Sequence, residues 1–511
     1  MSKKFKVSFF LFNCILSCWC ITVYNYPFFN TFFNTNAALW VKMILPIYVF
    51  LMFMAIHCLV LYKKTTKPLL YFFLTANAFA SYFISRYNVP LNRMIMINIF
   101  ETNAQEAGEF FDIHLYLYLL WTCILPIIVI HFADIQYPPF KTQIKQRLFI
   151  IILTTLIVGG TVVPFKKQIS IFTKENFNVR YMLVPTSYVS SLPQAFKMKY
   201  FSKTAYVKIN KDVKKTEYRK MDGRKNLFIF VLGESARNAN FSLTGYARDT
   251  CAPLTAYQDN LFVYQKMESC ATLTRYALPC IFTHFERKNL NADVAGYTDN
   301  VLDIIQSNGY KVKWFENELG CNKMCRNVET KFTCDSRQCY DIELNKQLYT
   351  DLPNITQDSF YVLHQRGSHG ISYYKRYPAE FEKYEELINA YDNTIYYTNY
   401  VLADLIQHLT ALDDQYNVVM LYTSDHGESL GENGVYLHGG QATEQREVPF
   451  MIWIGDKSMQ SLNLDKDCLQ KQTHMSTTHD NLFHTFLGLT GLSLSVYKPE
   501  LDLISSCKIK N

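Results

Sequence analysis

Apolar residues gather into five long stretches in the first third of the chain. The stretches cover roughly residues 9–29, 39–62, 69–87, 115–136 and 147–165, and each is near the length of about 20 residues that a helix needs to cross a bilayer. Core helices of soluble proteins seldom run so long with so few charges. The pattern therefore predicts a five-helix transmembrane domain over residues 1–165.

The loops between these stretches alternate in their content of basic residues. Residues 30–38 contain no Lys or Arg, and residues 88–114 contain only Arg93. The other loops and the N-terminus are basic, through Lys3, Lys4, Lys6, Lys63, Lys64, Lys67, Lys141, Lys145 and Arg147. Because basic loops stay on the cytoplasmic side, we predict a cytoplasmic N-terminus. Everything after the fifth stretch then lies outside. The first stretch resembles a signal peptide, but four more follow it, so we interpret it as a retained anchor.

A different pattern begins at Asn226, where short apolar runs end in polar groups. The runs NLFIFVLGES from Asn226 and NVVMLYTSDHGES from Asn417 have the length and composition of buried parallel strands. Helical patterns lie between them, for example over residues 380–409. We therefore predict an α/β domain with a mainly parallel sheet over residues 226–511. In such sheets the chemistry gathers at the carboxyl ends of the strands.

The segment between these two regions, residues 166–225, is predicted to be a basic linker with bridging helices. The chain has a formal charge of +7. Most of this charge comes from residues 197–225, which hold eleven basic residues against three acidic ones. The run follows a membrane segment and contains no aromatic-interleaved basic module or zinc finger. It therefore favours contact with anionic lipid headgroups over nucleic acid, with a solvated linker as the alternative.

Nine of the 14 cysteines lie outside the predicted spans. The oxidising side of the membrane favours local disulfides for the close pairs, which are Cys270 with Cys280, Cys321 with Cys325, and Cys334 with Cys339. The spacings Cys321-x3-Cys325 and Cys334-x4-Cys339 are also compatible with a structural zinc site. Cys468 and Cys507 are candidates for a fourth bridge that leaves Cys251 odd, and the sequence leaves this pairing open.

Four residues in the second region carry groups that suit a metal-assisted reaction. Glu234 and the pair Asp425 and His426 follow the two predicted strands, and Thr274 lies between Cys270 and Cys280. Two carboxylates, one imidazole and an exchangeable hydroxyl form a ligand set typical of Zn²⁺. A threonine hydroxyl is a poor nucleophile near neutral pH unless its alkoxide is stabilised, and a zinc ion supplies that stabilisation. Taken singly, each residue also has an ordinary structural explanation, as a helix cap or a strand-end turn.

Further histidines lie beside glycine-rich turns. We expect His369 and His438 to contact phosphate or to hold a second zinc ion. His364, which ends the apolar run FYVLH, is a further candidate for substrate contact and equally a candidate to support the other ligands. In the outer loop, Asn98, Thr102 and Glu106 are spaced at i, i+4 and i+8, which places them on one face of a helix. Such a face suits a lipid headgroup, although spacing alone favours a solvated face.

Four segments together resemble the bacterial phosphoethanolamine transferases, the group that includes lipid A-modifying and transferable polymyxin-resistance enzymes. They are GESARNANFSLTGY, SCATLTRYALPC, HQRGSHGISYYKRYP and SDHGESLGENGVYLHGG. The resemblance implies an inner-membrane enzyme whose five spans precede a periplasmic domain of alkaline phosphatase and sulfatase type. It also implies that Glu234, Thr274, Asp425 and His426 are zinc ligands, that Thr274 carries phosphoethanolamine, and that His369 and His438 contact its phosphate or a further zinc. It favours the headgroup-binding role of Asn98, Thr102 and Glu106.

The segment around Thr274 departs from the family's usual CGTxTAxSxPCMF. Ala271 stands where glycine is usual, Arg275 where alanine is usual and Ala277 where serine is usual. Arg275 either clamps a donor or acceptor phosphate or points to solvent. These differences concern the acceptor more than the metal set.

The expected reaction takes phosphoethanolamine from phosphatidylethanolamine and passes it to an envelope acceptor. The acceptor is lipid A, a core oligosaccharide sugar, or another periplasmic glycan or protein, and no residue chooses among them. Rival functions are hydrolysis by a phosphodiesterase or sulfatase, phosphoglycerol transfer, and a non-catalytic membrane scaffold.

Overall fold

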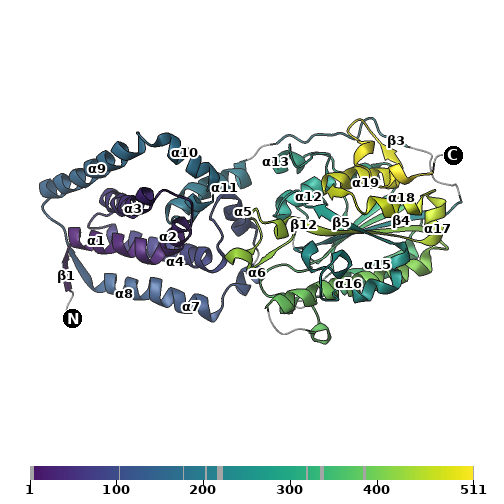
Figure 1. Cartoon of the computed structure of the whole chain (residues 1–511), viewed down its shortest axis with the longest axis horizontal. Helices are drawn as coiled ribbons and strands as arrows, with labels where there is room; N and C mark the ends of the chain where they lie inside the picture. Colours follow the sequence, from purple (N-terminus) through teal and green to yellow (C-terminus); the bar gives the residue numbers. More distant parts are fainter. Residues whose placement is uncertain are drawn as a thin grey trace. The chain divides into compact units, whose positions relative to one another are not determined.

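The computed structural model describes residues 5–102, 104–176, 178–201, 204–215, 222–317, 320–333, 339–383 and 387–509. The chain divides into two compact units (Figure 1). The membrane unit comprises Met1–Phe201 with Asn433–Val435, and the sheet unit comprises Ser202–Glu432 with Tyr436–Asn511. The bridging helices expected in the linker are α10 (Lys166–Glu175) and α11 (Thr186–Phe201), and both belong to the membrane unit.

Within the described residues, four helices of the membrane unit are long and apolar enough to cross a bilayer. They are α3 (Leu39–Val60), α4 (Thr66–Tyr87), the continuous segment Ile113–Phe132, and α9 (Phe140–Val162). The segment Ile113–Phe132 is built from α7 (Ile113–Leu119), the π-helix η2 (Leu120–Ile124) and α8 (Leu125–Phe132). The fourth predicted stretch extended to residue 136, but Ala133–Gln136 form strand β2, which pairs in parallel with β1 (Phe5–Ser8).

The first predicted span is bent. α1 (Phe9–Trp19) and the π-helix η1 (Cys20–Tyr24) end at Asn25, and α2 (Tyr26–Phe33) continues at an angle of 60°. The Asn25 side chain donates to the carbonyls of Cys20 (2.8 Å) and Val184 (2.9 Å), which stabilises the break by a contact distant in sequence. The unit therefore has five spans if the bent pair counts as one.

The predicted helical face of the outer loop is wrong as a continuous feature. α5 (Arg93–Glu101) ends before Thr102, whose φ of −59° and ψ of 127° leave the helical region, and α6 begins again at Ala104 and ends at Glu109. Thr102 donates both its backbone N–H and its hydroxyl to the Asn98 carbonyl. Asn98 lies in α5, Thr102 lies at the break, and Glu106 lies in α6, so the three residues do not share one uninterrupted helix. The side chain of Glu106 lies outside the described part.

The sheet unit contains an eight-stranded, mainly parallel sheet, as predicted. Among its strands in the described residues, only β12 runs antiparallel to its neighbours, β5 and β9. The strand order is β13 (Ser476–Thr478), β5 (Leu261–Glu268), β12 (Glu447–Ile454), β9 (Tyr416–Ser424), β4 (Lys225–Gly233), β8 (Ser359–His364), β6 (Lys311–Glu316) and β7 (Glu329–Phe332).

Alternate residues of β4 enter two different cores, one on each face of the sheet. Phe228, Phe230 and Leu232 pack with α12 (Thr274–Phe282), α14 (Val301–Ser307) and α19 (Asp480–Thr490). Leu227, Ile229 and Val231 pack with α15 (Ile342–Asp351) and α16 (Leu387–Leu412) (Figure 1). Because both faces of the strand are covered, its sequence is an unbroken apolar run rather than an alternating one.

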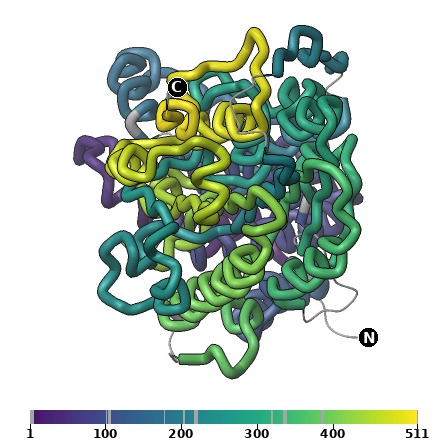
Figure 2. The backbone as a smooth tube through the Cα atoms, turned by 90° about the vertical axis from the view of Figure 1, so that its right-hand side faces the viewer, coloured from purple at the N-terminus to yellow at the C-terminus, as the bar shows by residue number. Residues whose placement is uncertain are grey.

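Shorter elements complete the sheet unit. They are α13 (Ala292–Ala295), α17 (Asp456–Ser461), α18 (Lys466–Gln472), and the two-residue strands β3 (Lys214–Lys215), β10 (Ser429–Leu430), β11 (Tyr436–Leu437) and β14 (Leu492–Ser493). β14 pairs with β3 from the linker segment. The C-terminal segment, yellow in Figure 2, packs against α19 and is tied to α18 by the Cys468–Cys507 disulfide.

Candidate active site

The carboxyl ends of two neighbouring strands bring three polar residues together. β4 and β9 pair in parallel with Gly233 opposite Ser424. Glu234 follows the first strand, and Asp425 and His426 follow the second; all three are fully buried. One ligand atom from each side chain lies within 4.8 Å of those of the other two. The parallel register thus joins groups that are about 190 positions apart in the sequence.

Thr274 lies beside these groups as the first residue of α12. Its Oγ1 is 3.2 Å from Glu234 Oε2 and 3.3 Å from His426 Nε2. The preceding loop is held on two sides, because Ser269 Oγ donates to the Asp425 carbonyl (2.5 Å) and Gly439 N donates to the Thr272 carbonyl (2.9 Å). The hydroxyl is therefore presented at a helix N-terminus, where the helix dipole favours negative charge.

Two backbone positions that the sequence reasoning missed hold Glu234 in place. Ser235 has a φ of +57°, its N–H donates to Asp425 Oδ1 (3.1 Å) and its hydroxyl donates to Glu234 Oε1 (2.7 Å). Gly367 has a φ of +51°, and a Cβ there would lie 2.6 Å from the Glu234 carbonyl oxygen. In the sequence these residues are Ser235 in GES and Gly367 in HQRGSHG, and neither motif predicts the backbone conformation at that position.

The charges of the cluster formed by Glu234, Asp425 and His426 favour binding of a cation. His426 Nδ1 lies 2.9 Å from the Gly427 carbonyl, where it can only donate. Nε2 of the neutral ring therefore directs a lone pair at Asp425 Oδ2 (3.2 Å) and Glu234 Oε1 (3.4 Å). Burial and the neighbouring His438 lower the pKa of His426 to about 3, so the ring itself does not supply the positive charge near neutral pH.

The surroundings of the Asp425 carboxyl also favour a bound cation. Burial and the adjacent Glu234 raise its pKa well above its usual range. Its Oδ2 is buried and accepts no hydrogen bond from the described residues. Two carboxylates and one imidazole lone pair converging in a buried site fit a divalent metal of the zinc type, which accepts both kinds of ligand atom.

His369 and His438 border the cluster. His369 Nδ1 is 3.3 Å from Glu234 Oε1, and the His438 ring lies 4.3 Å from that of His426 and 6.0 Å from that of His369. Both side chains are partly exposed, at 13% and 17%. They are therefore placed to meet a ligand that reaches the buried groups.

Glu428 is a further residue that the sequence reasoning missed. It is fully buried, and its Oε1 lies 3.6 Å from His438 Nδ1. Neither carboxylate oxygen has a hydrogen-bond partner among the described residues. The signal was available, since Glu428 follows Asp425 and His426 within SDHGES, but a glutamate in that position also suits a strand-end turn.

His364 does not join this group in the same way. It ends β8, beside Leu232 of β4, and its Nδ1 lies 3.9 Å from Glu316 Oε2 while its ring meets Trp314 edge-on at 5.5 Å. Burial is complete. These contacts join His364 to Glu316 and Trp314 of β6, and both of its expected roles, substrate contact and support of the other ligands, stay predictions.

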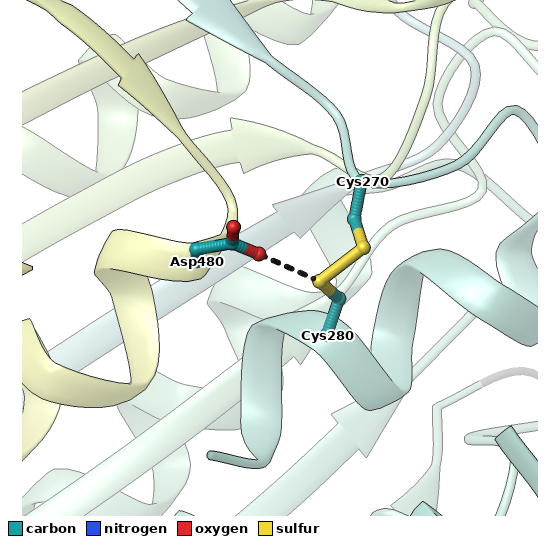
Figure 3. Close-up of side chains that lie close together, drawn as sticks. All are labelled: Cys270, Cys280 and Asp480. Atoms are coloured by element: carbon teal, nitrogen blue, oxygen red, sulfur yellow. Dashed lines mark hydrogen bonds between the residues drawn. A yellow bond between two sulfur atoms is a disulfide. The ribbon is translucent and has the colours of Figure 1, made fainter. Parts of the chain in front are cut away.

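The Cys270–Cys280 disulfide forms as expected and spans the loop that carries Thr274. Asp480 Oδ1 approaches Cys280 Sγ at 3.1 Å (Figure 3). Although two cysteines and an aspartate resemble a metal site, both sulfurs are bonded to each other. A disulfide sulfur carries no hydrogen, so the contact is a hydrogen bond only when Asp480 is protonated, and burial raises the pKa of this carboxyl.

The remaining cysteine expectations can be followed in part. Cys321–Cys325 and Cys468–Cys507 are disulfides, which argues against the four-cysteine zinc alternative. Cys334 lies outside the described residues, so its pairing with Cys339 is not described. Cys251 is free and buried, and Asn399 Nδ2 lies 3.4 Å from its sulfur.

Arg275, next to Thr274, forms an ion pair. Its guanidinium lies 3.2 Å from Asp293 Oδ1 of α13, and the two side chains are 17% and 20% exposed. The pairing with Asp293 was not among the alternatives for Arg275, and its role as a phosphate clamp stays a prediction.

Two family models match the chain. The sulfatase model covers residues 226–492, and the model described as phosphoethanolamine transferase EptA/EptB covers residues 48–200. The first range falls in the sheet unit apart from Asn433–Val435, and the second falls in the membrane unit.

Curated relatives and a solved structure agree with these models. Phosphoethanolamine transferase EptA of Escherichia coli (strain K12) is 31% identical over 473 residues, covering 86% of each chain. Phosphatidylethanolamine transferase Mcr-1 of Escherichia coli is 29% identical and covers 87% of each chain. The structure of the integral membrane protein lipooligosaccharide phosphoethanolamine transferase A from Neisseria meningitidis superposes with a TM-score of 0.90 at 27% identity, over 99% of this chain and 100% of that one. The chain therefore belongs to the phosphoethanolamine transferases of the alkaline phosphatase and sulfatase superfamily.

Proposed function

We propose that this transferase takes phosphoethanolamine from phosphatidylethanolamine, holds it covalently on Thr274, and passes it to an envelope acceptor. The position of the Thr274 hydroxyl, 3.2 Å from Glu234 and 3.3 Å from His426 at a helix N-terminus, carries the proposal. The name of Mcr-1, phosphatidylethanolamine transferase, supports the donor. Acceptors compatible with the family are a lipid A phosphate, a core sugar, or another periplasmic glycan or protein.

Glu234, Asp425, His426 and Thr274 would together hold one zinc ion. Such an ion, when bound, supplies Lewis-acid stabilisation of an alkoxide and of phosphoryl oxygens. The unshared lone pair of His426 Nε2 and the unpartnered Asp425 Oδ2 support this assignment. A second zinc ion, held by His369 and His438, is an alternative to direct phosphate contact by these two residues, and Glu428 would then be their neighbouring carboxylate.

The chain's own residues account for the two transfer steps. In the first, Thr274 Oγ bonds to phosphorus while the bond from phosphorus to the diacylglycerol oxygen breaks, and diacylglycerol leaves with the hydroxyl proton. In the second, an acceptor oxygen bonds to phosphorus, the bond to Thr274 Oγ breaks, and the acceptor's proton restores the hydroxyl. Glu234 and His426 orient Thr274, and the α12 N-terminus favours the negative phosphoryl group. His369 and His438, which are partly exposed, border the site. His364 is a candidate for substrate contact or for support of these residues.

The membrane unit fits a reaction between two membrane-associated substrates. We place it in the bacterial inner membrane with a cytoplasmic N-terminus, and the sheet unit in the periplasm, on the strength of the loop charges. Asn98, Thr102 and Glu106 remain candidates for headgroup contact, now as parts of a broken rather than a continuous helix. A membrane-impermeant thiol reagent tests the topology on intact cells, using single cysteines introduced at Thr35 and Lys64. We expect labelling at position 35 and not at position 64.

The covalent step is tested by mass spectrometry. The full-length protein, incubated with zinc and ethanolamine-labelled phosphatidylethanolamine, should carry the label on the peptide containing Thr274. Thr274→Ala should abolish the adduct and the transfer, and Thr274→Ser should retain part of both. Thr283→Ala, at the other end of α12, is the matched control and should keep the adduct. Full transfer activity in Thr274→Ala would refute the mechanism.

The same assay separates the rival functions. Release of free phosphoethanolamine without a transferred product would indicate hydrolysis, and preference for phosphatidylglycerol would indicate phosphoglycerol transfer. Absence of both adduct and stoichiometric zinc would indicate a scaffold. The acceptor is identified by comparing envelope glycolipids with and without the gene. If lipid A is modified, polymyxin binding should fall, because the group masks negative charge.

A further inference from the structure

The sheet unit contains a polar cleft of about 810 Å³, and none of the active-site residues described above lines it. All of its lining residues belong to the sheet unit. Its walls come from the segment before β3, the residues after α13, the helix α14, and the residues that follow the Cys321–Cys325 disulfide. Clefts of about 300–1,000 Å³ are the size that holds small-molecule ligands, so this one has room for such a ligand.

The side chain of Arg326 is held in a fixed direction in this cleft. Its guanidinium lies over the Tyr206 ring at 4.7 Å and over the Tyr297 ring at 5.8 Å, and its Nη1 donates to the Gly296 carbonyl (2.7 Å). The Cys321–Cys325 disulfide closes the loop directly before it. Nε and Nη2 donate to no residue that the structure describes. A planar guanidinium with these donors left over matches phosphate oxygens.

Two lysines add positive charge to the same lining. Lys208 and Lys211 both lie on the segment before β3, and neither forms an ion pair with a described residue. Their side chains are exposed, so each can turn toward a ligand in the cleft. Together with Arg326 they give the lining three cationic groups, which suits an anion with several oxygens.

The two carboxylates of the lining are already engaged by neighbouring groups. Asp299 accepts from Tyr206 Oη (2.7 Å) and from Ile209 N (2.9 Å), and Asp303 accepts from Asn327 Nδ2 (3.0 Å). These bonds tie the segment before β3 and the segment after the disulfide to α14 and the residues before it. The carboxylates therefore stabilise the walls of the cleft, and the three cations outnumber them.

Side-chain amides supply hydrogen-bond acceptors between the cations. Asn210 Nδ2 donates to Ser307 Oγ (2.5 Å), and Gln306 Nε2 donates to the Asn327 carbonyl (2.8 Å). Asn327 Nδ2 donates to Asp303 as described above. These bonds fix the amide nitrogens, while the side-chain oxygens of Asn210, Gln306 and Asn327 accept from no residue in the described part of the chain. Such oxygens suit a ligand that carries several hydroxyl donors.

We propose that this cleft binds a phosphorylated saccharide, with its phosphate at Arg326 and the two lysines and its hydroxyls at the amide oxygens. A neutral sugar would leave the three cations without a counter-charge. Inorganic phosphate would leave the amide oxygens of Asn210, Gln306 and Asn327 without donors. A ligand that carries both groups complements the whole lining.

The helix α13 connects this cleft to the segment that carries Thr274. Arg275, which follows Thr274, pairs with Asp293 in α13 (3.2 Å), and Tyr297 lies two residues beyond the end of that helix. Asp293 and Tyr297 are thus about one helical turn apart, or about 6 Å along the helix axis. A saccharide in the cleft is therefore in a position to belong to the acceptor. That assignment rests on the proposed function, whereas the binding itself does not.

Calorimetric titration of the full-length, zinc-loaded Thr274→Ala protein in mild detergent tests the cleft without the transfer reaction. The probes are N-acetylglucosamine 1-phosphate, N-acetylglucosamine, inorganic phosphate and glycerol 3-phosphate, the last of which represents a lipid headgroup. The sugar phosphate should bind at least about tenfold more tightly than each of the others, because only it offers both the charge and a full set of hydroxyl donors. Equal binding of inorganic phosphate or glycerol 3-phosphate would overturn the saccharide assignment.

Substitutions in the cleft show whether the probe binds there. Binding of the sugar phosphate should weaken about tenfold in Arg326→Gln, the size expected for the loss of charge-assisted hydrogen bonds. It should be lost in Ser307→Trp, which fills the cleft. The exposed pair Lys208→Glu with Lys211→Glu should also abolish it and keeps the test valid if either of the other variants does not fold. The matched controls, which lie outside the lining and should bind as the unsubstituted chain does, are Arg287→Gln, Thr410→Trp, and Lys466→Glu with Lys471→Glu.

Equal binding of the sugar phosphate in the cleft variants and the controls would overturn the proposal, because the probe would then occupy another site. With Thr274 restored, the cleft variants should raise the KM of a phosphorylated acceptor relative to the controls, and an unchanged KM would overturn the acceptor assignment. If the sugar phosphate binds as expected and Thr274 carries no adduct with phosphatidylethanolamine, the cleft stands and the proposed function fails.

Discussion

At the residue scale, the position of Glu234 depends on the backbone that packs against it. Tyr391 Oη donates to the Ser235 carbonyl (2.8 Å) and accepts from Arg237 N (2.9 Å). On the other side, Ser368 N donates to the Glu234 carbonyl (2.9 Å), and Asp341 accepts the N–H groups of Arg366 and Gly367. Glu234 is thus enclosed by segments from two other parts of the chain.

Gly367→Ala should disable the enzyme by displacing Glu234. The new Cβ would meet the Glu234 carbonyl at 2.6 Å, at a φ of +51° that L residues rarely adopt. The conformational strain alone costs about 1–2 kcal/mol, and we expect kcat to fall at least about tenfold because small displacements of catalytic groups are costly. The measurement is transfer rate together with thermal unfolding.

Gly245→Ala is the control for strain without collision. Gly245 has a φ of +107°, and no atom of the described residues lies within 4 Å of a Cβ placed there. This variant should lose stability but keep its transfer rate when it is assayed below its unfolding temperature. Equal losses of activity in the two variants would show that the contact with Glu234 is unimportant.

Arg275→Ala tests whether the neighbour of Thr274 acts on the acceptor. Because Arg275 is paired with Asp293, and both side chains are partly exposed, its removal should cost about 0–1 kcal/mol of stability. We expect adduct formation to stay within about twofold, since the described ion pair joins Arg275 to Asp293 and not to Thr274. Any effect should appear in the KM of the acceptor. Loss of the adduct itself would contradict this expectation, and Asp293→Asn shows the effect of releasing the arginine.

At the scale of elements, α12 and its preceding loop act as one constrained piece. The Cys270–Cys280 disulfide closes the loop across a separation of 10 residues, and Pro279 lies inside the helix. Since α12 also packs on α19 in the core, Thr274 is fixed from both ends of its helix.

Replacing both cysteines of this bridge with serine should reduce activity more than its effect on stability explains. Loss of a disulfide of this loop length costs about 2–3 kcal/mol, and the freed loop would no longer hold Thr274 in register. The control is Cys468→Ser with Cys507→Ser, which opens a bridge of separation 39 in the C-terminal segment. Transfer rates at a temperature where both variants are folded give the comparison. Similar rates in the two variants would remove the disulfide from the mechanism.

At the scale of the whole molecule, metal binding should link activity to stability. Chelator treatment should abolish transfer, and zinc should restore it and raise the unfolding temperature, because a ligand that binds only the folded state stabilises it. Calcium or magnesium at the same concentration should not, since the imidazole of His426 suits zinc better. Unchanged activity after complete zinc removal would contradict the assignment.

Asp425→Asn should affect stability in opposite directions in the absence and in the presence of zinc. The amide removes the repulsion between two buried carboxylates, so the metal-free variant should be at least as stable as the metal-free unsubstituted chain. With zinc present the order should reverse, because one ligand is lost. Thermal unfolding with and without zinc measures both orders, and an equal zinc response in the two proteins would exclude Asp425 as a ligand.

The sequence by itself determined the features that depend on local pattern. Four long apolar helices, the buried strands β4 and β9, the mainly parallel sheet and the pairs Cys270–Cys280 and Cys321–Cys325 follow from length, period and spacing. Motif chemistry also predicted the cluster of Glu234, Thr274, Asp425 and His426, because parallel strands place their carboxyl ends at one edge.

Tertiary structure decided the features that depend on contacts between distant segments. The bend after Tyr24 is stabilised by Asn25 through Val184, 159 positions away, and the helix break at Thr102 replaces an ideal i, i+4, i+8 face. Gly367 meets Glu234, Arg275 meets Asp293, and Glu428 lies beside His438 for the same reason. Local propensity carries no information about these partners, since each contact forms only when separate elements pack together.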